Sequence, residues 1–166
     1  MSATELLTTP LNALHLELGA KMVAFAGYSM PVSYPAGVIA EHRHCRASAA
    51  LFDVSHMGQL RLVGDAAAAA LETLIPMDVL GLGVGQQRYA FFTNPSGGLL
   101  DDLMVTRREA DLLLVVNAAC KDADIRHLQS HIGHRCRVQP LPDRAAARGH
   151  QDLAGPGEPT DPGADV

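Results

Sequence analysis

The chain lacks tryptophan, an excess of basic residues and long apolar runs. With a formal net charge of −5 it offers no basic surface to nucleic acid or to an anionic membrane, so we expect neither as a partner. Its most apolar long stretch, residues 109–119, is interrupted by Asp111 and Asn117 and suits a buried strand better than a membrane span. These absences predict an ordinary soluble globular chain. Its 166 residues are enough for one domain with its own hydrophobic core.

A disulfide framework is also missing. The three cysteines, Cys45, Cys120 and Cys136, are an odd number at wide spacing, which predicts free thiols in a reducing compartment. Residues 1–7 have neither the basic start nor the apolar run of a secretory signal. We therefore expect a cytoplasmic protein.

The residues that are present alternate between helical and strand periodicity, which favours an α+β fold. We expect a mixed or antiparallel sheet with packed helices, in which a meander of three strands occupies the middle of the chain. Gly27 and Pro31 predict an irregular loop over residues 27–37. The predicted helices cover residues 10–18, 38–50, 66–75 and 121–132, and the predicted strands cover 21–26, 57–63, 87–93, 99–107, 111–117 and 135–141.

The composition changes after Pro142. Residues 143–166 are mostly Ala, Gly, Pro, Asp and Arg, and Leu153 is their only large interior apolar side chain. Such a segment buries too little surface to offset the entropy of ordering it. The sequence therefore predicts a folded domain over residues 1–142 and a disordered tail over 143–166.

A carboxylate step follows a glycine turn. The segment Asn94-Pro95-Ser96-Gly97-Gly98 has the chemistry of a hairpin turn and leads to Asp101 and Asp102. Neighbours on a strand point to opposite faces, so the two carboxylates are not a converging pair. Spacing alone leaves two interpretations open: both decorate the end of a hairpin, or the inward one lies in a pocket and is tuned by burial.

Two further groups of residues invite a chemical interpretation. Ser55 and His56 are adjacent, so on a strand they diverge and do not form a nucleophile and its base. His127 and His131 have the four-residue spacing of metal ligands on a helix, and His134 follows. No glutamate completes the metalloprotease pattern, and we predict no metal site.

Several segments together are similar to a known family. They are Gly19-Ala20-Lys21-Met22-Val23, Phe25-Ala26-Gly27-Tyr28, Phe52-Asp53-Val54-Ser55-His56-Met57, Gly97-Gly98-Leu99-Leu100-Asp101-Asp102 and Leu114-Val115-Val116-Asn117-Ala118. Over residues 9 to 142 the chain resembles the folate-binding domain of aminomethyltransferases, the T-protein of the glycine cleavage system. The resemblance implies the fold of that domain and tetrahydrofolate as the cofactor.

The resemblance also implies roles for individual residues. It places Asp101 beside the reactive nitrogen of tetrahydrofolate as the catalytic carboxylate, and it leaves Asp102 a structural role. It assigns Met57, Tyr89, Val115 and Asn117 to the lining of the pterin pocket. Burial in the core is the alternative for the first three, whereas a buried amide such as Asn117 needs partners.

The reaction implied is transfer of a methylene carbon from the aminomethyl-lipoyl H-protein to tetrahydrofolate, with release of ammonia. Family members are about twice as long, and their Gly-Tyr-Thr-Gly-Glu type segment does not occur here. We therefore expect a truncated enzyme with weak folate binding. Two alternatives stay open: a non-catalytic folate- or partner-binding module completed by a second chain, and a relative of the folate-dependent demethylases.

Overall fold

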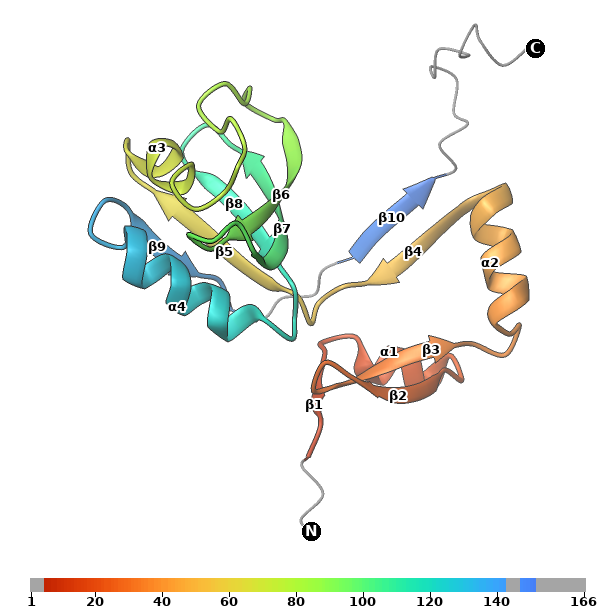
Figure 1. Cartoon of the computed structure of the whole chain (residues 1–166). Coiled ribbons are helices and arrows are strands. Elements are labelled where there is room, and N and C mark those ends of the chain that lie inside the picture. The colour runs from red at the N-terminus through yellow and green to blue at the C-terminus, as the bar shows by residue number, and fades with distance from the viewer. Residues whose placement is uncertain (1–4, 143–146, 152–166) are drawn as a thin grey trace, which may run out of the picture. The chain divides into compact units, whose positions relative to one another are not determined.

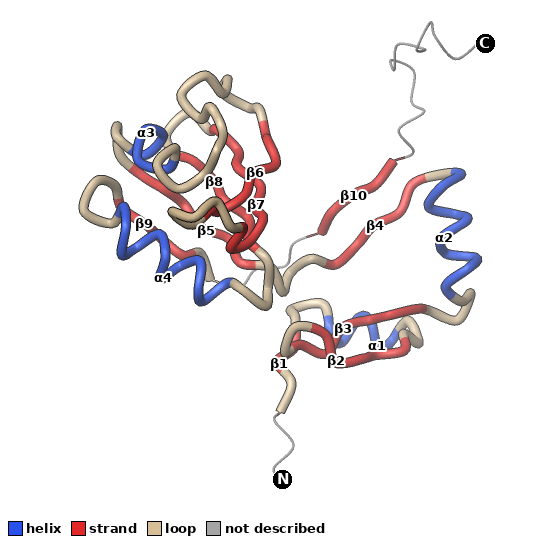
Figure 2. The backbone as a smooth tube through the Cα atoms, in the orientation of Figure 1, coloured by secondary structure: helices blue, strands red, loops and turns tan. Residues whose placement is uncertain are grey.

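The computed structural model describes residues 5–142 and 147–151. The described residues divide into two compact units, one built from residues 5–54 with 147–151 and the other from residues 55–142. Strands and short helices occur in both units (Figures 1 and 2). The predicted α+β class is confirmed.

The second unit is built on a five-stranded antiparallel sheet with the order β6-β7-β8-β5-β9 (Figure 1). The predicted meander is present as three consecutive neighbouring strands, β6, β7 and β8. The strands are β5 (Gly58–Val63), β6 (Gln87–Thr93), β7 (Leu99–Arg107), β8 (Leu112–Val116) and β9 (Arg137–Pro140).

One face of this sheet carries the core. Alternate strand residues, among them Leu60, Leu103 and Leu114, are almost fully buried. They form a single apolar cluster with α3 (Ala67–Leu71) and α4 (Lys121–Ile132), so both helices cover the same face. Each large side chain buried there contributes about 1.5–3 kcal/mol to folding. The strand residues between them lie on the opposite face, which is only partly buried.

A buried carboxylate fastens the turn between β7 and β8. The side chain of Asp111 is 2% exposed and accepts bonds from Arg61 Nε at 2.7 Å and from Arg108 Nε at 2.6 Å. The hydrogen bond from Arg108, followed by that from Arg61, holds the pKa of Asp111 below its usual value. The turn is thereby attached to β5, the other neighbour of β8 in the sheet.

The first unit contains two small sheets. Its elements are β1 (Leu7–Thr8), α1 (Asn12–Glu17), β2 (Lys21–Phe25), β3 (Tyr28–Ser33), α2 (Val38–Ala47), β4 (Ala49–Asp53) and β10 (Ala147–Gln151). In one sheet β3 pairs in parallel with β1 and antiparallel with β2, and in the other β4 pairs antiparallel with β10.

The loop predicted over residues 27–37 was wrong. A two-residue turn at Ala26 and Gly27, both with positive φ, connects β2 to β3. Pro31 is tolerated inside β3 because β1 pairs only with Tyr28 and Ser29, which leaves the outer edge open at the proline. The Ala-Gly pair lacks the usual Asn-Gly signature of such a turn, so the hairpin has a weak local signal.

Helix boundaries also differ from the prediction. Helix α2 ends at Ala47, because the following residues pair with β10 as strand β4. Helix α3 ends at Leu71 rather than at residue 75. Residues 147–151 fall in the segment for which composition predicted disorder, and they form β10. The rest of that segment lies outside the described residues, so the boundary at Pro142 stays a prediction.

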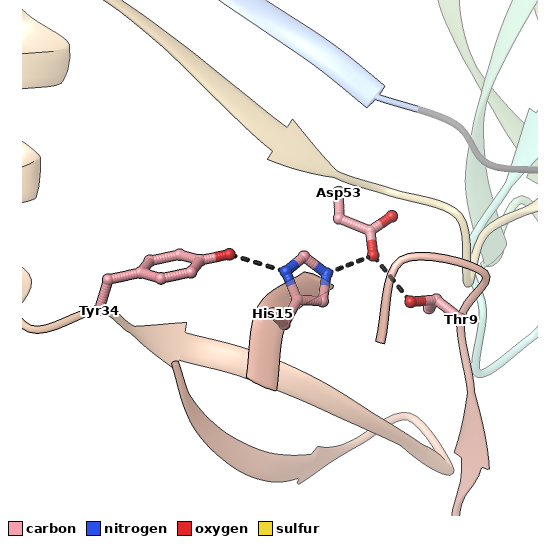
Figure 3. Close-up of polar contacts among 4 residues, drawn as sticks. All are labelled: Thr9, His15, Tyr34 and Asp53. Carbon is pink, nitrogen blue, oxygen red and sulfur yellow. Dashed lines mark hydrogen bonds and ion pairs between the residues drawn. The ribbon is translucent and has the colours of Figure 1, made fainter. Parts of the chain in front are cut away.

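Helix α1 presents its leucines to solvent and buries a histidine. Leu14 and Leu16 are exposed, whereas His15 is 5% exposed. Its ring lies between Tyr34 and Asp53, with 2.8 Å from Nδ1 to the Tyr34 hydroxyl and 2.8 Å from Nε2 to Asp53 Oδ2 (Figure 3). Thr9 donates to the same Asp53 oxygen at 2.9 Å. This network joins the end of β4 to α1 and to the segments after β1 and β3.

All three cysteines are free thiols, as predicted. No helix in the described ranges is long and apolar enough to cross a membrane.

Replacing Asp111 should destabilise the second unit. Asp111→Ala leaves two partly exposed guanidinium groups without their shared partner, and we expect a loss of about 1–2 kcal/mol in the free energy of unfolding, measured by urea denaturation at pH 7. Glu109→Ala, an exposed carboxylate in the same turn, is the control and should change little. Because the pKa of Asp111 is lowered, the difference should shrink as pH falls below about 4. Equal losses in the two variants would contradict this role.

The network in Figure 3 predicts the tautomer of His15. Burial, with the negative charges of Asp53 and Glu41, raises the pKa of Tyr34, so its hydroxyl keeps its proton and donates to Nδ1. The neutral ring then carries its hydrogen on Nε2 and donates to Asp53. Nitrogen-15 NMR at about pH 8 should show this tautomer for His15, with mixed tautomers for the exposed His42 and His44. Tyr34→Phe should remove the preference, and a hydrogen on Nδ1 in the unmodified chain would refute it.

Candidate functional site

The turn before β7 is held by one asparagine. Asn94 Oδ1 accepts bonds from the backbone N–H groups of Ser96 and Gly98 and from the Ser96 hydroxyl, at 2.7 to 3.0 Å. Gly97 has φ of +81°, a conformation that favours glycine. The predicted hairpin is therefore confirmed. It fixes the start of β7, on which Asp101 and Asp102 lie.

The amide of Asn117 brings the two aspartates together. Asn117 Nδ2 donates to Asp101 Oδ1 at 3.0 Å and to Asp102 Oδ1 at 2.9 Å, and it lies 3.4 Å from the backbone oxygen of Asp102. Asn117 directly follows β8, the neighbour of β7, so the sheet register supplies this contact. Charged acceptors make these hydrogen bonds stronger than neutral ones. The residue that the sequence marked as needing partners thus has two carboxylate partners.

The two carboxylates start from opposite faces of the sheet, as strand geometry predicts. Asp101 pairs in register with Phe92, which is fully buried and contacts His127 of α4 with ring centroids 5.5 Å apart. Asp101 therefore lies on the helix-covered side. Asp102 accepts a hydrogen bond from Tyr89, which raises the pKa of that phenol. Asn117 reaches both because it lies at the end of the β7–β8 ladder.

The remaining predicted pocket residues lie on or beside the open face. Tyr89 and Val115 both pair in register with Met104, so they share one row across three strands. Tyr89 is 54% exposed and Val115 is half-buried, so neither is a core residue. Met57 precedes Gly58, which pairs with Val116, so Met57 and Asn117 flank the same end of the β5–β8 ladder. The structure thus places these residues around one end of the sheet.

A third carboxyl group adjoins Asp101, and the sequence did not assign it to this site. Asp124, in the first turn of α4, is 4% exposed. Burial, then hydrogen bonding with Asp101 and the negative charges of Asp101 and Asp102, raises the pKa of Asp124 to about 7. Burial and the same carboxylates also raise the pKa of the Cys120 thiol. The sequence signal that could have identified Asp124 is an acidic residue on the same side of the helix as its buried apolar residues.

The other groups considered in the sequence do not form a comparable site. Ser55 and His56 are both buried. The rings of His127 and His131 lie 4.4 Å apart, and the His127 backbone oxygen is 2.8 Å from Nδ1 of His131. Within residues 5–142 and 147–151 no three His, Cys, Asp or Glu side chains are arranged to hold a metal ion.

These features define an α+β unit: an antiparallel sheet with two helices on one face, and two carboxylates bridged by Asn117 at one end of the sheet. The family model for the GCVT N-terminal domain matches residues 11–157, and the chain belongs to this family.

Relatives with known names agree with this assignment. The chain is 48% identical over 142 residues to the mitochondrial aminomethyltransferase of Dictyostelium discoideum, covering 86% of this chain and 35% of the relative. It is 47% identical over 128 residues to the aminomethyltransferase of Deinococcus deserti, covering 76% and 36%. The chain therefore spans about a third of the length of these relatives.

A solved structure shows the same fold. The crystal structure of the glycine cleavage system aminomethyltransferase T from Bartonella henselae is 42% identical and matches with a TM-score of 0.83, covering 88% of this chain and 41% of that chain. The sequence-based recognition of the N-terminal part of this family is confirmed.

The Asn117 bridge predicts an order of stability among variants. Asn117→Ala leaves two carboxylates without their shared donor, and we expect a loss of about 1–3 kcal/mol in the free energy of unfolding. Asn117→Asp adds a third negative charge and should cost more. Thermal and urea unfolding at pH 7 measure both. Gln129→Glu, the same type of change at an exposed site on α4, is the control. An aspartate variant as stable as the alanine variant would count against the bridge.

Proposed function

We propose that this chain supplies the N-terminal part of a tetrahydrofolate-dependent aminomethyltransferase site, with Asp101 as its catalytic carboxylate. The observation that carries the proposal is the Asn117 bridge, which ties Asp101 on the helix-covered side to Asp102 and to the open face on which Tyr89 and Val115 lie. The reaction is transfer of a methylene carbon from an aminomethyl-lipoyl protein to tetrahydrofolate, with release of ammonia.

The residues around this end of the sheet fit a pterin. A pterin is flat and aromatic, with hydrogen-bond donors and acceptors on its edge, so it needs an apolar wall and a few polar groups at the rim. Tyr89, Val115 and Met57 supply the wall, and the Tyr89 ring is braced edge-on by Phe91 at 5.1 Å. The amide of Asn117 supplies the polar rim.

The chemistry assigned to Asp101 is electrostatic. Tetrahydrofolate, when bound, supplies the nucleophilic nitrogen that takes up the carbon. Positive charge develops next to that nitrogen, and a carboxylate held in place stabilises the charge or accepts the proton. Asn117 fixes Asp101 Oδ1 beforehand, so little reorganisation is needed. Asp102 is engaged by Asn117 and Tyr89, which suits a structural role.

The partner and compartment follow from the same proposal. An aminomethyl donor of this class is carried on the lipoyl group of an H-protein, which we propose as the protein partner. Nucleic acid and membrane lipid are not expected, given the net charge of −5. The cytoplasm stays our prediction for the compartment, although relatives include proteins named as mitochondrial.

Calorimetric titration with tetrahydrofolate under anaerobic conditions tests the proposal. We expect weak binding to residues 1–166, because the matched part is about a third of the relatives. Asp101→Asn should weaken it by about tenfold, which corresponds to about 1.4 kcal/mol and to loss of one charged contact.

Asp122→Asn, an exposed aspartate on α4, is the matched control and should bind as the unmodified chain does. No binding at millimolar ligand, or equal weakening in both variants, would contradict the proposal. Submicromolar binding would overturn the expectation that this part alone forms an incomplete pocket.

A further inference from the structure

Asp101 and Asp124 meet between the sheet and the helix that covers it. Asp101 lies in register with Phe92, and Phe92 packs against His127, three residues after Asp124 on α4. Asp124 and Leu128 are both buried, so this side of the helix faces the sheet. The first turn of α4 therefore brings the Asp124 carboxyl group over Asp101.

One oxygen of each carboxyl group is unsatisfied. Asp101 Oδ2 and Asp124 Oδ2 are both buried, and neither receives a hydrogen bond from a donor in the described part of the chain. The two groups are within hydrogen-bonding reach of each other, but two carboxylates have no hydrogen between them unless one is protonated. Buried oxygens without partners are rare and are costly to leave unpaired.

We propose that Asp124 is a positioning residue for Asp101, and that its carboxyl group holds the proton that the pair shares and donates it to Asp101 Oδ2. The role of Asp124 in catalysis rests on the proposed function, whereas the presence of a shared proton does not. Asp101 would then be held at both oxygens, Oδ1 by Asn117 and Oδ2 by Asp124, and the pair would carry one negative charge.

The surroundings favour the proton on Asp124. Asp101 already accepts a hydrogen bond from Asn117 at 3.0 Å, which stabilises its charged form. Asp124 is the more buried of the two, and its pKa of about 7 leaves it protonated in mildly acidic solution. The amino end of α4 favours a charged carboxylate, but burial beside a second carboxylate outweighs this effect.

The charged and titratable groups around the pair come from four segments. Strand β7 contributes Asp102, which is bonded to Tyr89 of β6. Cys120 precedes α4; burial, the negative charges of Asp101 and Asp124 and a hydrogen bond with Asp101 raise the pKa of its thiol, so it stays neutral. On α4, burial lowers the pKa of His127, and Lys121 lays its aliphatic stem over Gly58. The described neighbours that influence Asp124 most are thus carboxylates.

Carbon-13 NMR of the aspartate side chains tests the shared proton directly. In the unmodified chain, without folate, the carboxyl carbon of Asp124 should report a titration step near pH 7. Asp101→Asn should lower the pH of that step, because it removes the neighbouring negative charge, and Asp122→Asn should leave it unchanged. An ordinary titration of Asp124 near pH 4 would overturn the proposal, and the unmodified chain alone decides this if a variant fails to fold.

The positioning role is tested by tetrahydrofolate affinity at two pH values. Affinity of the unmodified chain should fall by about tenfold between pH 6 and 8.5 as Asp124 ionises. Asp124→Asn keeps a neutral donor and should bind equally well at both, whereas Asp124→Ala should bind weakly at both. The same pH profile in the unmodified chain and in Asp124→Asn would refute this role. A step near pH 7 with no folate binding would instead leave the shared proton intact and reject the proposed function.

Discussion

The side-chain amide of Asn117 is the contact on which the candidate site depends. Two carboxylates that follow one another on a strand start from opposite faces, and they approach only if a donor between them offsets their repulsion. The two N–H groups of one amide do this at 3.0 and 2.9 Å. The antiparallel register of β7 and β8 places the amide where both oxygens reach it.

Each of the two aspartates also has a partner on its own face of the sheet. Asp101 faces Asp124 on the covered side, whereas Asp102 faces Tyr89 on the open side. Because the folded-state pKa of Asp124 lies above its ordinary value, the folded chain holds a proton that the unfolded chain releases between about pH 4 and 7. This group therefore lowers the free energy of unfolding as pH rises through that window. A buried acid that reduces stability at neutral pH is typical of a functional arrangement.

Much of this arrangement could be predicted from the sequence, because local chemistry determines it. The alternation of apolar and polar residues predicted the meander β6-β7-β8, and the turn residues 94–98 predicted the hairpin that leads to Asp101. Strand β4 was missed because its pairing with β10, nearly a hundred residues later, overrides the helix preference of Ala49 and Ala50. The β2–β3 hairpin was missed because its turn is Ala-Gly and its second strand contains a proline.

The candidate site, like the fold, was only partly predictable from the sequence. The family resemblance selected Asp101, Tyr89, Val115 and Asn117, but the partner of Asp101 on α4 depends on how a helix packs on a sheet. Spacing did not show that His15 rather than the leucines of α1 is buried, because the network with Tyr34 and Asp53 joins segments distant in sequence. Contacts made by tertiary packing have no local signature.

Intermolecular nuclear Overhauser effects from tetrahydrofolate to methyl groups of the chain are the most direct measurement of the central claim, that the ligand lies at the Asn117 end of the open face. We expect contacts from the pterin protons to the methyl groups of Met57 and Val115. Contacts confined to the helix-covered face, at Leu103 and Val105, or no contacts at saturating ligand, would contradict it.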